Sequence, residues 1–202
     1  MVKYILVGGK IYKAPDGGKA FCEELIKDIN HRPVKILDCL FAREKDAWEN
    51  KFSDDQAFFA KNIQDFEIEL ALPDRFIEQV KNSDVIFFQG GMPKLLMSQL
   101  DPSRDWAKEL DGKILVGSSG GADTIVKYYG VGKTSAIGEG LGLLPIKFIP
   151  HWKSEYYGQD IVVDWDGLLE KLKTHEEQLE TIVLQDGEFK VYEQDSVVHS
   201  QL

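Results

Sequence analysis

Short runs of apolar residues, many of them β-branched or aromatic, recur along the first 120 positions and are separated by amphipathic stretches. The runs lie at 3–9, 34–41, 66–71, 84–91 and 113–119. Runs without polar alternation are typical of strands that are covered on both faces. The helix-like stretches lie at 19–30, 54–65, 73–82, 93–100 and 103–110. This alternation predicts an α/β fold with a mostly parallel sheet and helices on both faces.

The pattern changes after residue 130. A short strand-like run, "PIKFIPHW", is followed by a helical stretch at 164–179. The segment "ETIVLQDGEFKVYEQDSVVH" predicts an antiparallel hairpin with Asp186 and Gly187 at its turn. No repeat, low-complexity tract or linker interrupts the chain. We therefore expect one three-layer domain over residues 1–202.

The charge of the chain limits its partners. It carries 34 acidic and 24 basic residues, a formal net charge of −10, which argues against non-specific binding to nucleic acid or to an anionic membrane. No apolar run is long enough to span a bilayer, and no targeting segment precedes the first strand. We expect Cys22 and Cys39 to be two buried, reduced thiols. These features predict a cytoplasmic protein.

A glycine-rich corner follows the apolar run that ends near residue 118. There the sequence reads Gly117-Ser118-Ser119-Gly120-Gly121 and continues into an expected helix that includes Tyr128 and Tyr129. Ser119 has glycines two residues before and two residues after it, which matches the G-x-S-x-G pattern of a nucleophile elbow. Such corners also serve structural and phosphate-binding roles, so the spacing alone leaves these alternatives open.

A serine nucleophile needs a general base, and the chain has four histidines. His31 and His175 lie in polar stretches, and His199 lies close to the C-terminus. His151 differs because it follows the apolar run "IKFIP" at what we expect to be the end of a strand. Ligands bind at the carboxyl ends of strands in such sheets, so His151 is the candidate base. No cluster of histidine, cysteine and carboxylate residues suggests a metal site.

Four segments together resemble the serine peptidase family of dipeptidase E (aspartyl dipeptidase) and cyanophycinase. They are "VIFFQGGMPKLL", "GSSGGA", "GLGLLPIKFIPHW" and "TIVLQDGEFKV", and they span roughly residues 84–192. Gly120 stands where the family usually has alanine, and Met92 where it often has asparagine. The resemblance implies a fold like that of class I glutamine amidotransferases, no cofactor, and a short peptide as substrate. The resemblance leaves open whether the protein forms a homodimer.

By this resemblance Ser119 is the nucleophile and His151 the general base. The backbone at Gly90 and Gly91 and the amide of Gly120 would form the oxyanion hole. The acid that orients His151 is less defined. Glu139 is the best candidate for this acid. An equally supported interpretation is that Glu139 is an exposed loop carboxylate without a catalytic role. Glu155 is a weaker choice.

Other functions stay open at this point. A true α/β-hydrolase is disfavoured, because that fold places an acid-bearing strand between the serine and the histidine and usually has a longer C-terminal portion. Here only 32 positions separate Ser119 from His151, and 83 residues follow the serine. The chain could instead be a non-catalytic relative that binds a small peptide or an acidic ligand at the same corner. An esterase-like hydrolase is a third interpretation.

Overall fold

The computed structural model describes residues 1–100, 102–155, 158 and 161–194. His199 lies outside the described residues. The strands are β1 (Val2–Val7), β2 (Val34–Cys39), β3 (Phe66–Leu70), β4 (Val85–Phe88), β5 (Ile114–Ser118), β6 (Val126–Val131), β7 (Ala136–Glu139), β8 (Leu144–Ile149), β9 (Thr181–Val183) and β10 (Phe189–Gln194). The helices are α1 (Lys19–Ile26), α2 (Trp48–Asn62), α3 (Phe76–Asn82), α4 (Pro93–Gln99), α5 (Asp105–Lys108), α6 (Gly120–Ile125) and α7 (Trp165–Thr174), with 3-10 turns η1 (Ile11–Lys13) and η2 (Lys45–Ala47).

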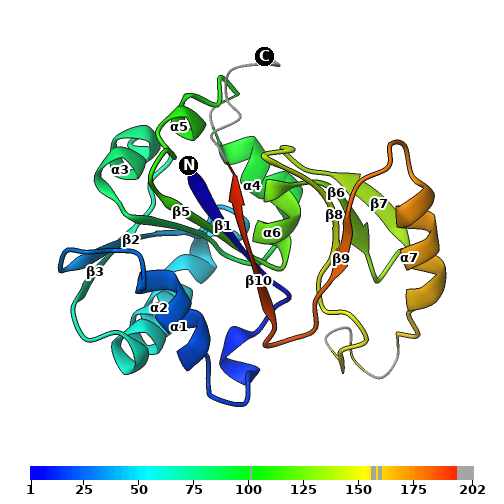
Figure 1. The fold of residues 1–202 in the computed structure, drawn as a ribbon, viewed down its shortest axis with the longest axis horizontal. Coiled ribbons are helices and arrows are strands. Elements are labelled where there is room, and N and C mark those ends of the chain that lie inside the picture. The colour runs from blue at the N-terminus through cyan, green and yellow to red at the C-terminus, as the bar shows by residue number, and fades with distance from the viewer. Residues whose placement is uncertain (101, 156–157, 159–160, 195–202) are drawn as a thin grey trace.

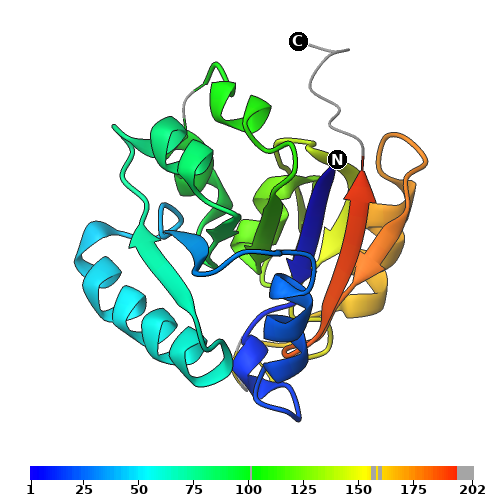
Figure 2. The ribbon, with the colours of Figure 1, turned by 60° about the vertical axis from the view of Figure 1, so that its left-hand side comes forward.

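A six-stranded sheet forms the centre of the molecule, in the order β10-β1-β5-β4-β2-β3. Its strands are parallel except β10, which pairs antiparallel with β1. Alternate side chains of these strands enter two different cores, one under α1 and α2 and one under α3, α4 and α5. Helices therefore cover both faces of the sheet (Figures 1 and 2), and the predicted α/β class is confirmed.

A second sheet, in the order β7-β6-β8-β9, packs beside the first and carries α7 on its outer side (Figure 1). The sequence did not reveal this sheet. Tyr128 and Tyr129, which we expected in the helix after the glycine corner, lie in β6 because α6 ends at Ile125. The run Val126–Val131 is rich in β-branched and aromatic residues, which favour a strand.

The C-terminal strands also pair differently from the expected hairpin. The antiparallel strand β10 is present, but its partner is β1, whereas β9 lies parallel to β8 in the second sheet. Asp186 and Gly187 do form a turn, in which the amide of Gly187 donates to the carbonyl of Gly9 over 2.8 Å. That turn carries the chain from one sheet to the other.

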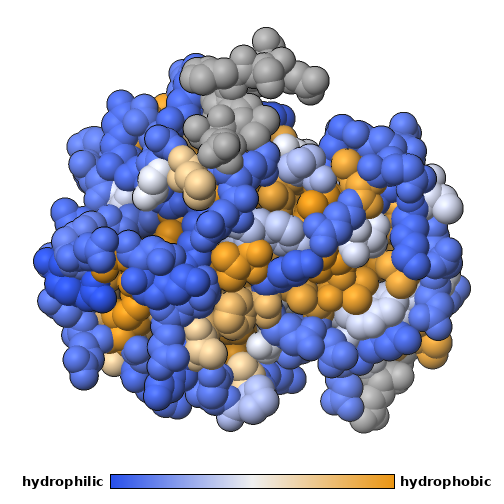
Figure 3. Space-filling view, in the orientation of Figure 1, coloured by the Kyte–Doolittle hydropathy of each residue, from blue (hydrophilic) through white to orange (hydrophobic). Residues whose placement is uncertain are grey.

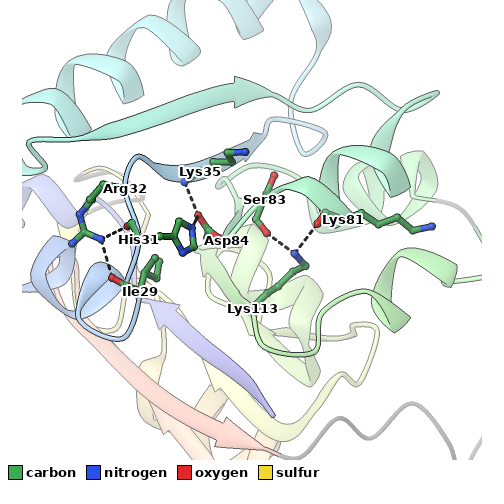
Figure 4. A network of polar contacts seen from close by, with 8 residues as sticks. All are labelled: Ile29, His31, Arg32, Lys35, Lys81, Ser83, Asp84 and Lys113. Carbon is green, nitrogen blue, oxygen red and sulfur yellow. Dashed lines mark hydrogen bonds and ion pairs between the residues drawn. The ribbon is translucent and has the colours of Figure 1, made fainter.

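Polar contacts hold the amino ends of the central strands together (Figure 4). Asp84 accepts a hydrogen bond from the amide of Lys35 over 2.8 Å and contacts His31 over 3.0 Å. Lys113 donates to the carbonyl oxygens of Lys81 and Ser83. These contacts lie at the amino ends, so they position the strands and leave the carboxyl ends free for a site.

The outer surface is largely hydrophilic in the orientation of Figure 1, with hydrophobic residues gathered near β9 and β10 (Figure 3). Within the described residues, no helix is both long enough and apolar enough to cross a membrane.

Candidate active site

Ser119 lies at the corner between β5 and α6, where the two sheets meet (Figure 1). Its backbone has a positive φ, with φ 51° and ψ −119°, a conformation that a residue with a side chain adopts only when its surroundings impose it. Those surroundings need glycine: a Cβ at Gly117 would lie 2.6 Å from the backbone of Ala122, and one at Gly121 would lie 2.0 Å from the carbonyl oxygen of Phe88. The glycines of the elbow pattern therefore allow the sharp turn that exposes the serine.

His151 reaches this corner from the end of β8, in the second sheet. Its Nε2 lies 2.7 Å from Oγ of Ser119, within hydrogen-bond distance. The ring packs against the end of β1, where a Cβ on Gly9 would lie 2.1 Å from the histidine Cε1. His151 also has a positive φ, at 54°, and its amide donates to the carbonyl of Gly8 over 2.9 Å. Gly9 thus makes room for the imidazole.

Asp186 completes a chain of hydrogen bonds. Its Oδ1 lies 2.6 Å from Nδ1 of His151, and the two side chains are only 10% and 3% exposed. A hydrogen on Nδ1 that points to this carboxylate leaves Nε2 free to accept the hydroxyl hydrogen of Ser119. Lys10 and Lys13 lie 3.9 and 4.0 Å from the other oxygen, Oδ2. The arrangement matches the geometry of a serine–histidine–aspartate triad.

The structure does not bring Glu139 to the place that we expected for it. Glu139 is the last residue of β7, at the edge of the second sheet, and it is exposed. Asp186 occupies the position beside His151 instead, because β9 runs parallel to β8 and ends next to it. Glu155 is exposed as well. The Asp-Gly pair after β9 looked like a simple turn in the sequence, which concealed this carboxylate.

The surroundings of His151 favour its neutral form. Burial lowers the pKa of its imidazole below the ordinary value, and the cation of Lys10 lowers it further. The hydrogen bond and the negative charge of Asp186 act in the opposite direction but do not outweigh burial. A neutral imidazole beside a hydroxyl can accept a proton near neutral pH.

The three glycines that we expected at an oxyanion hole lie around the serine. A Cβ on Gly90 would lie 3.2 Å from Cβ of Ser119. One on Gly120 would lie 2.1 Å from the carbonyl oxygen and 3.1 Å from the nitrogen of Gly91, so the two backbones are in direct contact. Gly120 is also the first residue of α6, where an amide has no partner within the helix.

A cavity of about 710 Å³ opens beside Ser119 and His151. Its wall includes residues of α2 and η1 and carries four cations, Lys10, Arg43, Lys51 and Lys61. Two carboxylates, Asp54 and Asp55, also line it, and Asp55 forms an ion pair with Lys51 and accepts a hydrogen bond from Gln89 over 2.8 Å. The cavity is thus cationic within a chain that is acidic as a whole.

The other described histidines have different surroundings. His31 contacts Asp84 at the amino ends of the strands, and the ring of His175 packs edge-on against Tyr128. Among the described residues, no group of three or more histidine, cysteine, aspartate or glutamate side chains is arranged to hold a metal ion.

Neither the protein-family models nor the curated protein sequences yield a match to this chain. Solved structures, by contrast, do match it. A peptidase from an acI-B1 actinobacterium superposes with a TM-score of 0.70 at 20% identity, over 95% of this chain and 83% of that one. A protein of Listeria monocytogenes EGD-e that carries the name peptidase E superposes with a TM-score of 0.61 at 12% identity, over 96% of this chain and 100% of that one. The chain therefore has a peptidase E-like fold.

Proposed function

We propose that this protein is a serine hydrolase that cleaves short peptides, with Ser119 as its nucleophile. The observation that carries the proposal is the continuous hydrogen-bonded chain from Ser119 through His151 to Asp186, which opens on a large cavity. Its members come from three segments far apart in the sequence, and two of them have a strained backbone. The peptidase E-like fold supports the same interpretation.

The proposed reaction follows from the order of the hydrogen bonds. His151 accepts the hydroxyl proton of Ser119 while Oγ attacks the carbonyl carbon of the peptide bond. Asp186 stabilises the imidazolium that forms. The imidazolium then gives its proton to the leaving amine, and the C–N bond breaks to leave an acyl-enzyme. A water molecule, activated by the same imidazole, hydrolyses the acyl-enzyme and regenerates Ser119.

The tetrahedral intermediate carries a negative charge on its oxygen, and backbone amides near the serine can stabilise it. Gly91 and Gly120 supply two such amides from neighbouring backbones, and Gly90 holds this segment against Ser119. Losing one such donor typically lowers kcat about 100- to 1000-fold.

The charges of the large cavity support a short substrate. A dipeptide has its carboxylate only one residue beyond the scissile bond, so a cation that lines the same cavity as the serine can bind it. Arg43 and Lys51 line that cavity, and the forked guanidinium of arginine suits a carboxylate.

A serine-directed fluorophosphonate tests the proposal directly. Purified protein should be labelled, and mass mapping should place the label on Ser119. The variants Ser119→Ala and His151→Ala should remain unlabelled while keeping the circular-dichroism spectrum of the parent. A panel of dipeptides, starting with those that begin with aspartate, then identifies the preferred substrate.

Absence of labelling in folded protein would overturn the proposal. The non-catalytic alternative would then be favoured if the same dipeptides bind with unchanged affinity to Ser119→Ala. Cleavage of activated esters without cleavage of any dipeptide would favour the esterase interpretation.

A further inference from the structure

A buried polar cluster lies where α2 meets the central sheet, beside the large cavity. It consists of Asp38 in β2, Asp55 in α2 and Gln89 just after β4, which are 0%, 5% and 4% exposed. Asp38 pairs with Phe87 across the sheet, and the amide of Gln89 continues this ladder by donating to the carbonyl of Cys39 over 3.0 Å. Because side chains alternate along a strand, Gln89 projects from the same face of the sheet as Asp38. Asp55 and Gln89 also line the cavity.

The carboxyl group of Asp55 is the centre of this cluster. Its Oδ1 accepts a hydrogen bond from the ammonium of Lys51, and its Oδ2 accepts one from the side-chain amide of Gln89 over 2.8 Å. A carboxylate has about four acceptor positions, so Asp55 has room for a third donor.

The carboxyl group of Asp38 has no such donors. Both of its oxygens are shielded from solvent, and among the residues that the structure describes none donates a hydrogen bond to either oxygen. Its close neighbour is a second acceptor, because the carboxyl groups of Asp38 and Asp55 lie within hydrogen-bond reach of each other. Two buried carboxyl groups in contact cannot both be ionised. One proton between them satisfies both groups.

The surroundings place this proton on Asp38. Burial and the negative charge of Asp55 raise the pKa of Asp38 well above its ordinary value. Lys51 and the nearby amide of Gln89 lower it, but they do not outweigh burial. Burial raises the pKa of Asp55 as well, whereas the cations of Lys51 and Arg43 lower it. Asp55 therefore keeps the charge, beside the ammonium that balances it.

We infer that Asp38 and Asp55 share one proton and that this pair fixes the side chain of Gln89, which makes Asp55 a positioning residue for the proposed reaction. Asp38 donates its hydroxyl hydrogen to Asp55, and Asp55 accepts the amide hydrogen of Gln89. The inference rests on the function proposed above, because the segment that Gln89 begins is the one that would bind the oxyanion.

Gln89 leads directly into Gly90 and Gly91, whose backbone lies against the Ser119 corner. The backbone of this segment is held at both ends, by the bond from the amide of Gln89 described above and by the amide of Met92, which donates to the carbonyl of Ala42 over 2.8 Å. The side chain of Gln89 adds a buried hydrogen bond to a charged acceptor, and such bonds are about twice as strong as neutral ones. Loss of this bond frees the Gly90–Gly91 backbone to shift away from the serine.

Gln89→Met removes the hydrogen bond to Asp55 and keeps a side chain of similar length. We expect kcat for a dipeptide and the rate of fluorophosphonate labelling to fall at least about tenfold. KM should stay within about threefold of the parent, because the change acts on the transition state. Gln89→Asn, whose amide is one methylene too short to reach Asp55, should show the same loss and is the second variant if Gln89→Met does not fold. Gln56→Met, which changes an exposed glutamine next to Asp55 in α2, is the matched control and should keep both rates.

Urea unfolding of Asp38→Asn tests the shared proton without any measurement of activity. Asparagine is neutral and keeps an N–H donor toward Asp55. The unfolded parent loses the Asp38 proton above about pH 3.9, whereas the folded parent keeps it. The folding equilibrium constant of the parent, relative to that of Asp38→Asn, should therefore fall about tenfold for each unit from about pH 5 to 8. Asp54→Asn, which changes an exposed carboxylate next to Asp55, should give a profile parallel to that of the parent.

Parallel profiles of the parent and Asp38→Asn would overturn the shared proton. An unchanged kcat in Gln89→Met would overturn the positioning role, and a raised KM with unchanged kcat would make Gln89 a substrate-binding residue instead. If the folded parent itself is not labelled, the proposed hydrolase fails and the positioning role fails with it, whereas the unfolding profiles still decide whether the proton is shared.

Discussion

Replacing Asp186 with asparagine tests the acid that the structure places beside His151. The 2.6 Å contact lies between side chains that are 3% and 10% exposed, so water screens it little. In serine proteases the equivalent change lowers kcat about 10⁴-fold, because the imidazolium loses its partner and the tautomer is no longer fixed. Lys10 and Lys13 partly neutralise Asp186, so we expect a loss of about 10³- to 10⁴-fold. At about 1.36 kcal/mol for each factor of ten, this is roughly 4–5.5 kcal/mol of transition-state stabilisation.

Glu139→Gln is the matched control, because Glu139 was the acid indicated by the sequence. Its exposed position at the edge of β7 predicts kcat within about twofold of the parent. Hydrolysis of the preferred dipeptide should be measured at about pH 8, well above the ordinary pKa of histidine, so that the imidazole of His151 is neutral in all three proteins. Asparagine suits the turn at position 186 as well as aspartate does, so the fold should persist. The reasoning is refuted if Glu139→Gln loses as much activity as Asp186→Asn, or if Asp186→Asn keeps more than a tenth.

Three further predictions concern pH and packing. Burial lowers the pKa of His151 from its ordinary value of 6.5, so kcat/KM should reach half of its maximum below pH 6.5. Lys10→Met should move that midpoint upward, because the cation of Lys10 also lowers the pKa. A midpoint above pH 6.5 in the parent contradicts this. Burial raises the pKa of Asp123, so the folded state keeps a proton that the unfolded state loses above about pH 3.9. The free energy of unfolding of the parent, relative to that of Asp123→Asn, should therefore fall by about 1.4 kcal/mol for each pH unit until the folded-state pKa is reached. Urea unfolding from about pH 5 to 8 checks this difference. Parallel pH profiles of the two proteins would contradict it. Gly120→Ala places a Cβ 2.1 Å from the carbonyl oxygen of Gly91 and should lower kcat at least tenfold by displacing that backbone; an unchanged kcat would contradict this.

The central sheet could be predicted because its strands are buried on both faces. Runs such as Val85–Phe88 and Ile114–Ser118 have apolar residues on both sides, and only a covered strand tolerates that pattern. The second sheet could not be predicted in the same way. Val126–Val131 follows α6 without a break, and its apolar spacing also fits one more turn of helix. The segment is a strand because it pairs with Ala136–Glu139 and Leu144–Ile149.

The candidate site also contains residues that the sequence predicts and one that it does not. Ser119 has a local signature, since the glycines around it are needed by the corner itself. His151 could be inferred from its place at a strand end. Asp186 has no local signature, because an Asp-Gly pair most often marks a hairpin turn. Its position depends on the pairing of β9 with β8 and of β10 with β1, which brings residues 35 positions apart into contact.

The positive φ of Ser119 and His151 has a consequence for how such a chain can change over time. Glycine adopts positive φ freely, so each of these two positions would be relaxed by a glycine that abolishes the hydrogen-bonded pair. The strain at such a residue is about 1–3 kcal/mol. Random substitution under selection for stability alone would therefore favour glycine at these two positions. Their persistence as serine and histidine would be the mark of selection on chemistry, and their loss in a stable descendant would leave an inert copy of the same fold.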